Sequence, residues 1–354
     1  MRVRRSGSLV ILLEGEDLVF HNYLAQSTFL ANPQALEIVR AVSDWTDLDA
    51  LSARFPGYSK GSLQGAISDL ATLGALVIEG DEEAEADARF QREWLWGPFA
   101  AAFHHATRVG SFMSEASAVE MLQDRAHFTP SPPLYLTNSD PANDISLPVR
   151  NEYGEPFATM SRRRTHRAFR QAPLSLLEIA DCLLFSMAIT AVIEDPEVVD
   201  LPLKMTPSGG ARNPYEAYVA ARRVEGLEPG VYHYSAMERT LGRVGGPPPA
   251  FGALLAGQDW ADDAAALIFL VANFERTMWK YHDPMAYRVV AVEAGHIGQN
   301  IMLTATHHGF LANPTGAMDF EAVEATLGVS GPTKGVLYCL ILGRPGPLET
   351  QVPA

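Results

Sequence analysis

Residues 289–309 read VVAVEAGHIGQNIMLTATHHG, and they carry the clearest structural signal in the second half of the chain. The stretch predicts a long, largely apolar helix that Gly309 ends. Gly295 and Gly298 lie inside this helix, where glycine costs stability relative to alanine. They therefore predict a close approach of the helix to another helix or to a ligand. We interpret His296 as a satisfied core histidine rather than a ligand.

Further elements are predicted around this helix. Ser175 is a candidate N-cap, and Leu227–Gly230 has the composition of a turn between two strands. We expect a helix at 174–188 and strands at 216–224, 231–234, 266–274 and 336–342. Long helices mixed with strands predict an α+β domain over residues 156–354, in which a central mixed or antiparallel sheet is layered by helices.

Residues 1–80 predict a small winged-helix-like domain. Two short apolar runs flank Glu14–Asp17, which is typical of a hairpin. Asn32 followed by Pro33 predicts the cap and first residue of a helix. Two more helices, over 48–55 and from Ser59 to Gly74, and a closing strand at 75–78 complete the pattern. Such a domain can bind DNA, a peptide or a partner protein, or simply pack against the rest of the molecule.

Residues 81–155 are interpreted as a linker that includes an aromatic-rich helix. The acidic run Asp81–Asp87 is typical of a solvated boundary. Trp94 and Trp96 belong to the aromatic helix, together with the pair His104-His105. No further ligands accompany these histidines, so packing is a better interpretation than metal binding, and we expect no metal site.

The composition describes a globular protein that is strongly acidic. Of 354 residues, 47% are hydrophobic and 19% are charged, and the net charge is −15. Such a charge opposes binding to nucleic acid or to an anionic membrane. Cys182 and Cys339 lie among apolar residues and are expected to be buried free thiols. The apolar run at 9–13 is too short for a signal peptide, so we expect a cytoplasmic protein.

Two loop-like stretches have the composition of ligand sites. Arg162–Phe169 reads RRRTHRAF, and several guanidinium groups beside a hydroxyl suit a phosphate, although a solvated face would read the same way. Pro207–Pro214 reads PSGGARNP, in which two glycines let the main chain approach a flat or anionic ligand. Neither the Rossmann nor the P-loop spacing is present, which disfavours dinucleotide and triphosphate sites.

A third stretch carries proton-transfer groups. Lys280 lies beside Tyr281, and such a pair can supply a base or a proton donor where the chain brings both side chains together. Asn313–Gly316 and Gly343–Pro345 add a tight loop and a late arginine near the end of the chain.

Taken in order, these stretches resemble the SagB-type azoline dehydrogenases of the nitroreductase superfamily. The shared features are the arginine-rich opening, Pro207–Arg212, Glu225–Tyr234, Lys280-Tyr281, Glu293–Asn300 and Gly343–Pro345. The resemblance implies a nitroreductase-like FMN-binding fold behind a winged-helix-like domain. It also implies a homodimer with its active sites at the subunit interface.

The resemblance assigns site residues. Lys280 and Tyr281 would be the catalytic pair. The phosphate and ribityl chain of FMN would be held by Arg163, Arg164, Thr165, Arg167 and Arg344. The flavin would be lined by Ser208, Gly209, Gly210 and Asn213, and approached near its N5 edge by Pro314, Thr315 and Gly316.

The implied reaction oxidises a thiazoline or oxazoline ring of a ribosomally made peptide to a thiazole or oxazole. The expected partners are that peptide and a cyclodehydratase complex. Three other functions stay open: an NAD(P)H-dependent nitroreductase or quinone reductase, a dehydrogenase of a small or carrier-bound metabolite, and a non-catalytic scaffold subunit of a modification complex.

The chain departs from the family pattern at three places. Asn213 stands where many relatives carry histidine, and Thr165 stands where serine is common; both keep a hydrogen-bonding group. Asp283-Pro284-Met285 follows the Lys-Tyr pair and reshapes the expected substrate side. These departures bear on the identity of the substrate more than on flavin binding.

Overall fold

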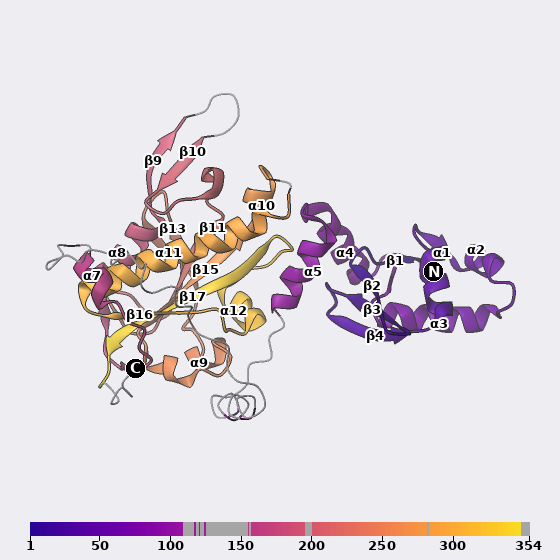
Figure 1. Ribbon diagram of the computed structural model, residues 1–354, viewed down its shortest axis with the longest axis horizontal. Coiled ribbons are helices and arrows are strands. Elements are labelled where there is room, and N and C mark those ends of the chain that lie inside the picture. Colours follow the sequence, from indigo (N-terminus) through magenta and orange to yellow (C-terminus); the bar gives the residue numbers. More distant parts are fainter. Residues whose placement is uncertain are drawn as a thin grey trace, which may run out of the picture.

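The computed structural model describes residues 1–108, 157–194, 200–281 and 283–347, together with Ser117, Glu120, Asp124 and Glu155. Two packed units follow one another along the described chain, and α4 and α5 lie between them (Figure 1). Of the linker expected at 81–155, the part after residue 108 falls mostly outside the described residues.

The second unit is built on an antiparallel sheet. Its strands lie in the order β14-β13-β11-β15-β17-β16, and the short strand β7 (Phe169–Arg170) pairs with the end of β17. The strands are β11 (Tyr215–Ala221), β13 (Gly230–Ser235), β14 (Thr240–Gly245), β15 (Ala266–Asn273), β16 (Leu311–Thr315) and β17 (Lys334–Pro345). The predicted α+β architecture is confirmed, and β14 and β16 are strands that the sequence pattern did not indicate.

Strand β15 places the core on both faces of this sheet. Side chains alternate between the two faces of a strand, so a buried central strand must be apolar at every position. Ile268 and Leu270 pack in the cluster that holds α8 (Leu176–Met187) and α11 (Ala286–His308). Leu267 and Phe269 pack in the cluster that holds α9 (Phe251–Leu254) and α12 (Phe320–Leu327). Each such side chain contributes about 1.5–3 kcal/mol of burial free energy.

The ends of the two long helices follow from local residues. Ser175 caps α8 in a capping box with Glu178, as expected. Gly309 ends α11 in the left-handed conformation, with φ of 76°. A close approach is found at Gly298, where an added Cβ would lie 2.6 Å from Cε1 of Tyr338, although this neighbour lies on strand β17 and not on a helix or a ligand. At Gly295 an added Cβ would meet nothing within 4 Å in this chain, so contacts within the chain do not account for that glycine.

His296 also differs from its prediction. Its side chain is exposed, because it lies on the face of α11 that turns away from the sheet. The cysteines behave as expected: Cys182 and Cys339 are buried free thiols, and burial raises the pKa of both.

Shorter elements connect the main layers. They are α7 (Phe157–Arg162), β8 (Leu174–Ser175), the hairpin β9 (Ile189–Ile193) and β10 (Leu201–Lys204), η2 (Gly209–Ala211), β12 (Val224–Glu225), η3 (Asp259–Asp263) and α10 (Phe274–Met278). The hairpin β9–β10 extends away from the sheet (Figure 1).

The first unit, the front unit (residues 1–80), combines two small sheets with three helices. One sheet has the order β5-β1-β6, and the other has the order β2-β3-β4. The strands are β1 (Arg2–Arg5), β2 (Leu9–Glu14), β3 (Asp17–Asn22), β4 (Ser27–Ala31), β5 (Thr46–Asp47) and β6 (Leu76–Ile78), and the helices are α1 (Pro33–Ala41), α2 (Leu48–Arg54) and α3 (Lys60–Thr72). The predicted hairpin and the caps Asn32 and Ser59 are confirmed, since both side chains accept a main-chain N–H of the next turn.

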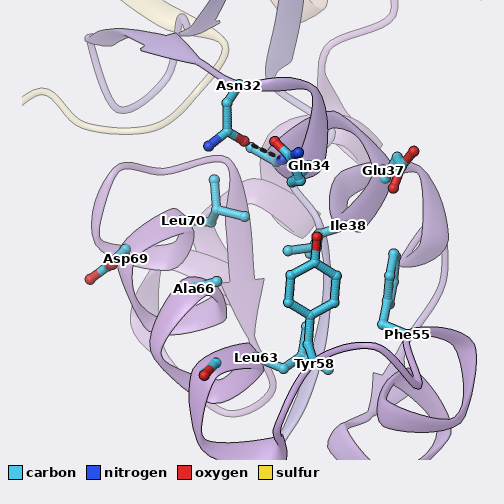
Figure 2. A pocket seen from close by; sticks show the side chains of 12 residues that line it. Asn32, Gln34, Glu37, Ile38, Phe55, Tyr58, Leu63, Ala66, Asp69 and Leu70 are labelled. Carbon is cyan, nitrogen blue, oxygen red and sulfur yellow. Dashed lines mark hydrogen bonds between the residues drawn. The ribbon is translucent and has the colours of Figure 1, made fainter.

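A groove in the front unit lies between α1, α3 and the segment that follows α2 (Figure 2). Ile38, Leu63 and Leu70 form its apolar floor, and its volume is about 350 Å³. Glu37 and Asp69 lie on opposite sides of it and are the charged residues among its lining (Figure 2).

Helix α4 (Glu82–Glu93) covers most of the acidic run, whose residues Asp81, Glu82, Glu83 and Glu85 are exposed as interpreted, whereas Asp87 is not. Asp87 is buried, with 2% of its surface exposed. Its carboxylate pairs with Arg4 at 2.8 Å and accepts hydrogen bonds from the hydroxyls of Ser6 and Ser8. This carboxylate therefore links helix α4 to the front unit through an ion pair and hydrogen bonds.

Candidate functional site

The loop before β11 has an unusual main-chain conformation. Gly210, Ala211 and Asn213 have φ of 60°, 55° and 45°, in the left-handed region that non-glycine residues seldom adopt. Ser208 supports the loop, because its hydroxyl accepts the Asn213 N–H at 2.9 Å and its carbonyl accepts the Ala211 N–H at 3.0 Å. Strained main chain of this kind concentrates at functional sites.

The same loop lies against the predicted catalytic pair. A Cβ added to Gly210 would lie 2.4 Å from the Tyr281 hydroxyl and 3.0 Å from the Lys280 amine. A Cβ added to Gly209 would lie 2.5 Å from Cγ1 of Val289. A larger residue at either position would force these side chains to move, and the structure brings the glycine loop and the Lys-Tyr pair together.

Arg276 of α10 joins the two parts of this site. Its guanidinium donates to the main-chain oxygen of Asn213 at 2.8 Å and pairs with the carboxylate of Glu216. Arg212 in turn donates a hydrogen bond to the main-chain oxygen of Arg276 at 3.0 Å. The guanidinium of Arg212 lies 4.7 Å from the ring centre of Trp279. Arg276 and Glu216 were not predicted, because no motif marks them and their partners are distant in sequence.

A pocket of about 470 Å³ lies beside the loop, and Arg276, Glu216 and Lys204 are among its lining residues. Lys204 forms an ion pair with Glu293 of α11 at 3.1 Å, and their side chains are 2% and 3% exposed. Burial is the larger influence and lowers the pKa of Lys204, while Glu293 opposes that shift. Oδ1 of Asn213 is buried and accepts no hydrogen bond from any described residue.

The arginine-rich stretch forms a second group of site residues. Its main chain is held by Asn313 of β16, whose side-chain oxygen accepts the His166 N–H at 3.2 Å and whose amide donates to the His166 oxygen. Arg163 donates to the Thr165 hydroxyl at 3.2 Å, and Arg164 donates to the main-chain oxygen of Arg163 at 2.8 Å. Pro314–Gly316 follow Asn313 directly, so they lie beside this stretch.

Two predicted phosphate ligands have other contacts. Arg344 makes a forked ion pair with Glu178, with both distances 2.8 Å, and donates its Nε–H to the Pro173 oxygen at 3.1 Å. Burial acts to raise the pKa of Glu178, but the hydrogen bonds from Ser175 and Arg344 outweigh it and lower that pKa. The Arg167 guanidinium lies 5.7 Å from the ring centre of Trp260. A phosphate role for Arg344 stays a prediction.

The two groups of site residues lie toward opposite ends of α11. Lys280, Tyr281 and the glycine loop are beside its first residues, and Asn313 lies just beyond its end. Figure 1 shows α10 at one end of α11 and α7 at the other. The helix has 23 residues, which corresponds to about 34 Å. Within one chain, the predicted catalytic pair therefore lies far from the predicted phosphate ligands.

Within the described residues, no group of three or more His, Cys, Asp and Glu side chains is placed to hold a metal ion. Helices of the described ranges are all too short or too polar to cross a lipid bilayer.

A model of the nitroreductase family matches residues 160–344. The candidate nitroreductase MJ1384 of Methanocaldococcus jannaschii is 32% identical over 158 residues, which cover 44% of this chain and 75% of that protein. The trifolitoxin-processing protein TfxB of Rhizobium leguminosarum bv. trifolii is 33% identical over 147 residues, which cover 40% of this chain and 39% of TfxB.

A solved structure extends the likeness beyond the matched region. A chain from the E. coli microcin synthetase McbBCD complex, solved with truncated pro-MccB17 bound, has a TM-score of 0.52. The match covers 75% of this chain and 98% of that chain at 20% identity. At this identity the likeness concerns the fold alone.

Proposed function

Because the chain belongs to the nitroreductase family, we propose that it is an FMN-dependent dehydrogenase that oxidises thiazoline or oxazoline rings of a ribosomally made peptide. Membership confirms the nitroreductase-like fold expected for the second half of the chain and makes the protein an oxidoreductase of that family. The SagB-type motif order and the relative named as trifolitoxin-processing support a peptide substrate over a free metabolite.

The residues present fit FMN at two places. Gly209 and Gly210 carry no side chain, so the main chain of this loop can approach a flat ligand closely, and the buried Oδ1 of Asn213 has no partner among the described residues. Arg163 and Arg164 supply the fixed positive charge that a phosphate needs. When bound, FMN would accept the two electrons that leave the substrate. Arg344 is paired with Glu178, so a phosphate role for it would require sharing its guanidinium between the carboxylate and the phosphate.

The juxtaposition of Lys280 and Tyr281 at Gly210 is the observation that carries the proposal. Conversion of an azoline to an azole removes two hydrogens from neighbouring ring carbons, one as a proton and one as a hydride. The Lys280 amine or the Tyr281 phenolate oxygen would take the proton. Arg276 holds the main chain of the facing loop at Asn213, and this loop lies against Lys280 and Tyr281.

A homodimer would complete the site. The catalytic pair and the arginine stretch lie toward opposite ends of α11, so a second copy running the other way would place one group beside the partner's other group. Exposed apolar side chains on α8 and α11 suit such a contact: Leu177, Phe185, Val289 and Val292 are 68%, 47%, 37% and 58% exposed. Extended exposed apolar surface is typical of interaction sites.

The groove of the front unit is the proposed docking place for the peptide. Its floor is apolar, and the charged residues in its lining, Glu37 and Asp69, are both acidic. A segment with two apolar side chains flanked by lysine or arginine complements this surface. Docking in the groove would hold the peptide near the catalytic unit while its rings are oxidised in turn.

The test measures azoline oxidation by the full chain loaded with FMN. Lys280→Ala is expected to keep FMN bound and to lower turnover by about 10²–10⁴-fold, because the proton acceptor is lost. Lys334→Ala removes an exposed lysine of the same unit and serves as the control.

Asp69→Lys in the groove is expected to raise the KM for the peptide with little change in kcat. Asp17→Lys on the hairpin is the control and is expected to leave KM unchanged.

Other outcomes select the alternatives. Unchanged turnover in Lys280→Ala contradicts the catalytic assignment. Flavin that NAD(P)H bleaches rapidly, with no azoline turnover, indicates a nitroreductase or quinone reductase. A purified chain that is colourless and takes up no FMN indicates a scaffold subunit.

A further inference from the structure

Trp96, in the turn between α4 and α5 (Gly97–Arg108), reaches the predicted catalytic pair from a distant part of the sequence. Its indole N–H donates to the main-chain oxygen of Tyr281 at 2.9 Å. The ring of Trp96 is 1% exposed, whereas Tyr281 is 37% exposed. A fully buried side chain thus holds the main chain of a residue whose own side chain faces the site.

The bond satisfies a carbonyl at the end of a helical turn. The N–H groups of Lys280 and Tyr281 both donate to the Thr277 oxygen, at 3.1 and 2.9 Å. Carbonyls in the last turn of a helix have no partner within the helix and need one from elsewhere. Trp96 supplies that partner at Tyr281.

Aromatic residues hold both flanks of the same segment. Phe274 begins α10, and its ring lies 5.8 Å from the rings of Trp94 and Trp96. Tyr287 lies in the first turn of α11, stacks on Phe274 at 5.3 Å and lies 5.7 Å from Trp96. His104 of α5 is within 3.0 Å of the Tyr287 hydroxyl. The segment between α10 and α11 is therefore held at its start, at Tyr281 and at its end.

We propose that Trp96 is a positioning residue for Lys280 and Tyr281. Its N–H fixes the main chain at Tyr281, so that the amine and the phenol stay at Gly210. The space there is already filled, since an added Cβ would fall within 3.0 Å of both groups. The catalytic meaning of this role rests on the proposed function; the restraint on the main chain does not.

Trp94 provides a matched control. It lies in the same aromatic cluster and is 5% exposed, but its indole N–H donates to the Gly97 oxygen at 3.1 Å within its own turn. Trp96→Phe and Trp94→Phe each remove one buried indole N–H and leave a ring. Only Trp96→Phe removes a bond to the predicted catalytic segment.

The first readout is hydrogen exchange in the full chain, followed by mass spectrometry of the peptide that contains Lys280 and Tyr281. Trp96→Phe is expected to speed exchange in this peptide about tenfold, because one hydrogen bond that holds the segment is lost. Exchange in the peptides of α3 is expected to stay unchanged. Trp94→Phe is expected to leave the Lys280 peptide at the wild-type rate. Equal rates in the two variants would overturn the proposal.

The second readout is the split between kcat and KM for the azoline peptide. Trp96→Phe is expected to lower kcat about tenfold with KM within twofold, because positioning acts on the reacting geometry. Equal kcat in the two variants would overturn the role. Wild-type protein without azoline turnover would refute the proposed function, and the exchange rates would then decide the positioning role by themselves.

A second variant covers the case in which Trp96→Phe does not fold. Benzothienylalanine at position 96 keeps the bicyclic ring and replaces the N–H by sulfur. It is expected to give the same tenfold faster exchange. Wild-type exchange with this residue would overturn the proposal.

Discussion

His105 is an uncharged histidine at the meeting point of the two units. Its ring lies 5.8 Å from that of Tyr23 in the front unit and 5.4 Å from that of Phe90 in α4. Burial, chiefly, and the nearby charge of Arg108 lower the pKa of His105 from 6.5 to about 4. Between these values the unfolded chain binds a proton that the folded chain does not.

Stability at this residue is therefore expected to fall on acidification. The free energy of unfolding rises with pH wherever the unfolded state holds more protons, so this contribution is complete above pH 6.5 and is lost as the pH falls toward 4. His105→Phe keeps the aromatic packing and removes the titration. The free energy of unfolding of this variant is expected to exceed that of wild type by about 1–2 kcal/mol at pH 4, after allowance for partial exposure.

Urea unfolding at several pH values measures this difference. His21→Phe on the surface of β3 controls for the loss of a histidine. A gap between His105→Phe and wild type that stays constant from pH 7 to pH 4 would contradict the assignment.

Helix α11 offers a comparison between two glycines three residues apart. Gly298 has Cε1 of Tyr338 within 2.6 Å of an added Cβ, whereas Gly295 has open space. Gly298→Ala is expected to destabilise the protein by about 1–3 kcal/mol, because the helix must move off β17. Gly295→Ala is expected to be neutral or to add about 0.5–1 kcal/mol through helix propensity.

Unfolding curves at one protein concentration compare the two variants. Equal stabilities would contradict the close contact with Tyr338. Helix propensity alone would then explain the effect of alanine at position 298.

Elements with local signals were predictable from the sequence, and those set by distant partners were not. Ser175 with Glu178, and Gly309, are encoded within one helical turn, and they placed the ends of α8 and α11. Asp87 looked like part of a solvated run because the groups that bury it, Arg4 and Ser6, are about 80 residues away.

The candidate site divides in the same way. Lys280, Tyr281 and the glycine loop are contiguous motifs, and their order in the chain was enough to predict them as one site. Arg276 and Trp96 act through main-chain oxygens of residues far along the sequence. A contact to a main-chain oxygen leaves no trace in the identity of the acceptor, so no pattern marks these two residues.

At the scale of the whole molecule, the proposed homodimer predicts that FMN binding and the oligomeric state change together. Val292→Glu places a charge in the exposed apolar face of α11, where Val292 is 58% exposed. The charge would be costly to bury between two copies. The variant is expected to become a monomer and to lose most of its bound FMN.

Light scattering after size exclusion, with the flavin absorbance recorded on the same run, measures both. Leu13→Glu alters an exposed leucine of the front unit, which is 78% exposed, and is expected to stay dimeric and yellow. A wild-type monomer that binds FMN would contradict the shared site.

Helix α4 and the turn that follows it belong to both units at once. Asp87 is the counter-ion of Arg4 in the front unit, while Trp94 and Trp96 complete the aromatic cluster around Phe274 in the other unit. A cut before α4 would leave Arg4 without its carboxylate, and a cut after it would open the apolar surface of Phe274. Neither end of α4 is therefore a simple point for exchanging domains: a front unit taken from another protein would bind this helix only if it carried groups equivalent to Arg4, Ser6 and Ser8.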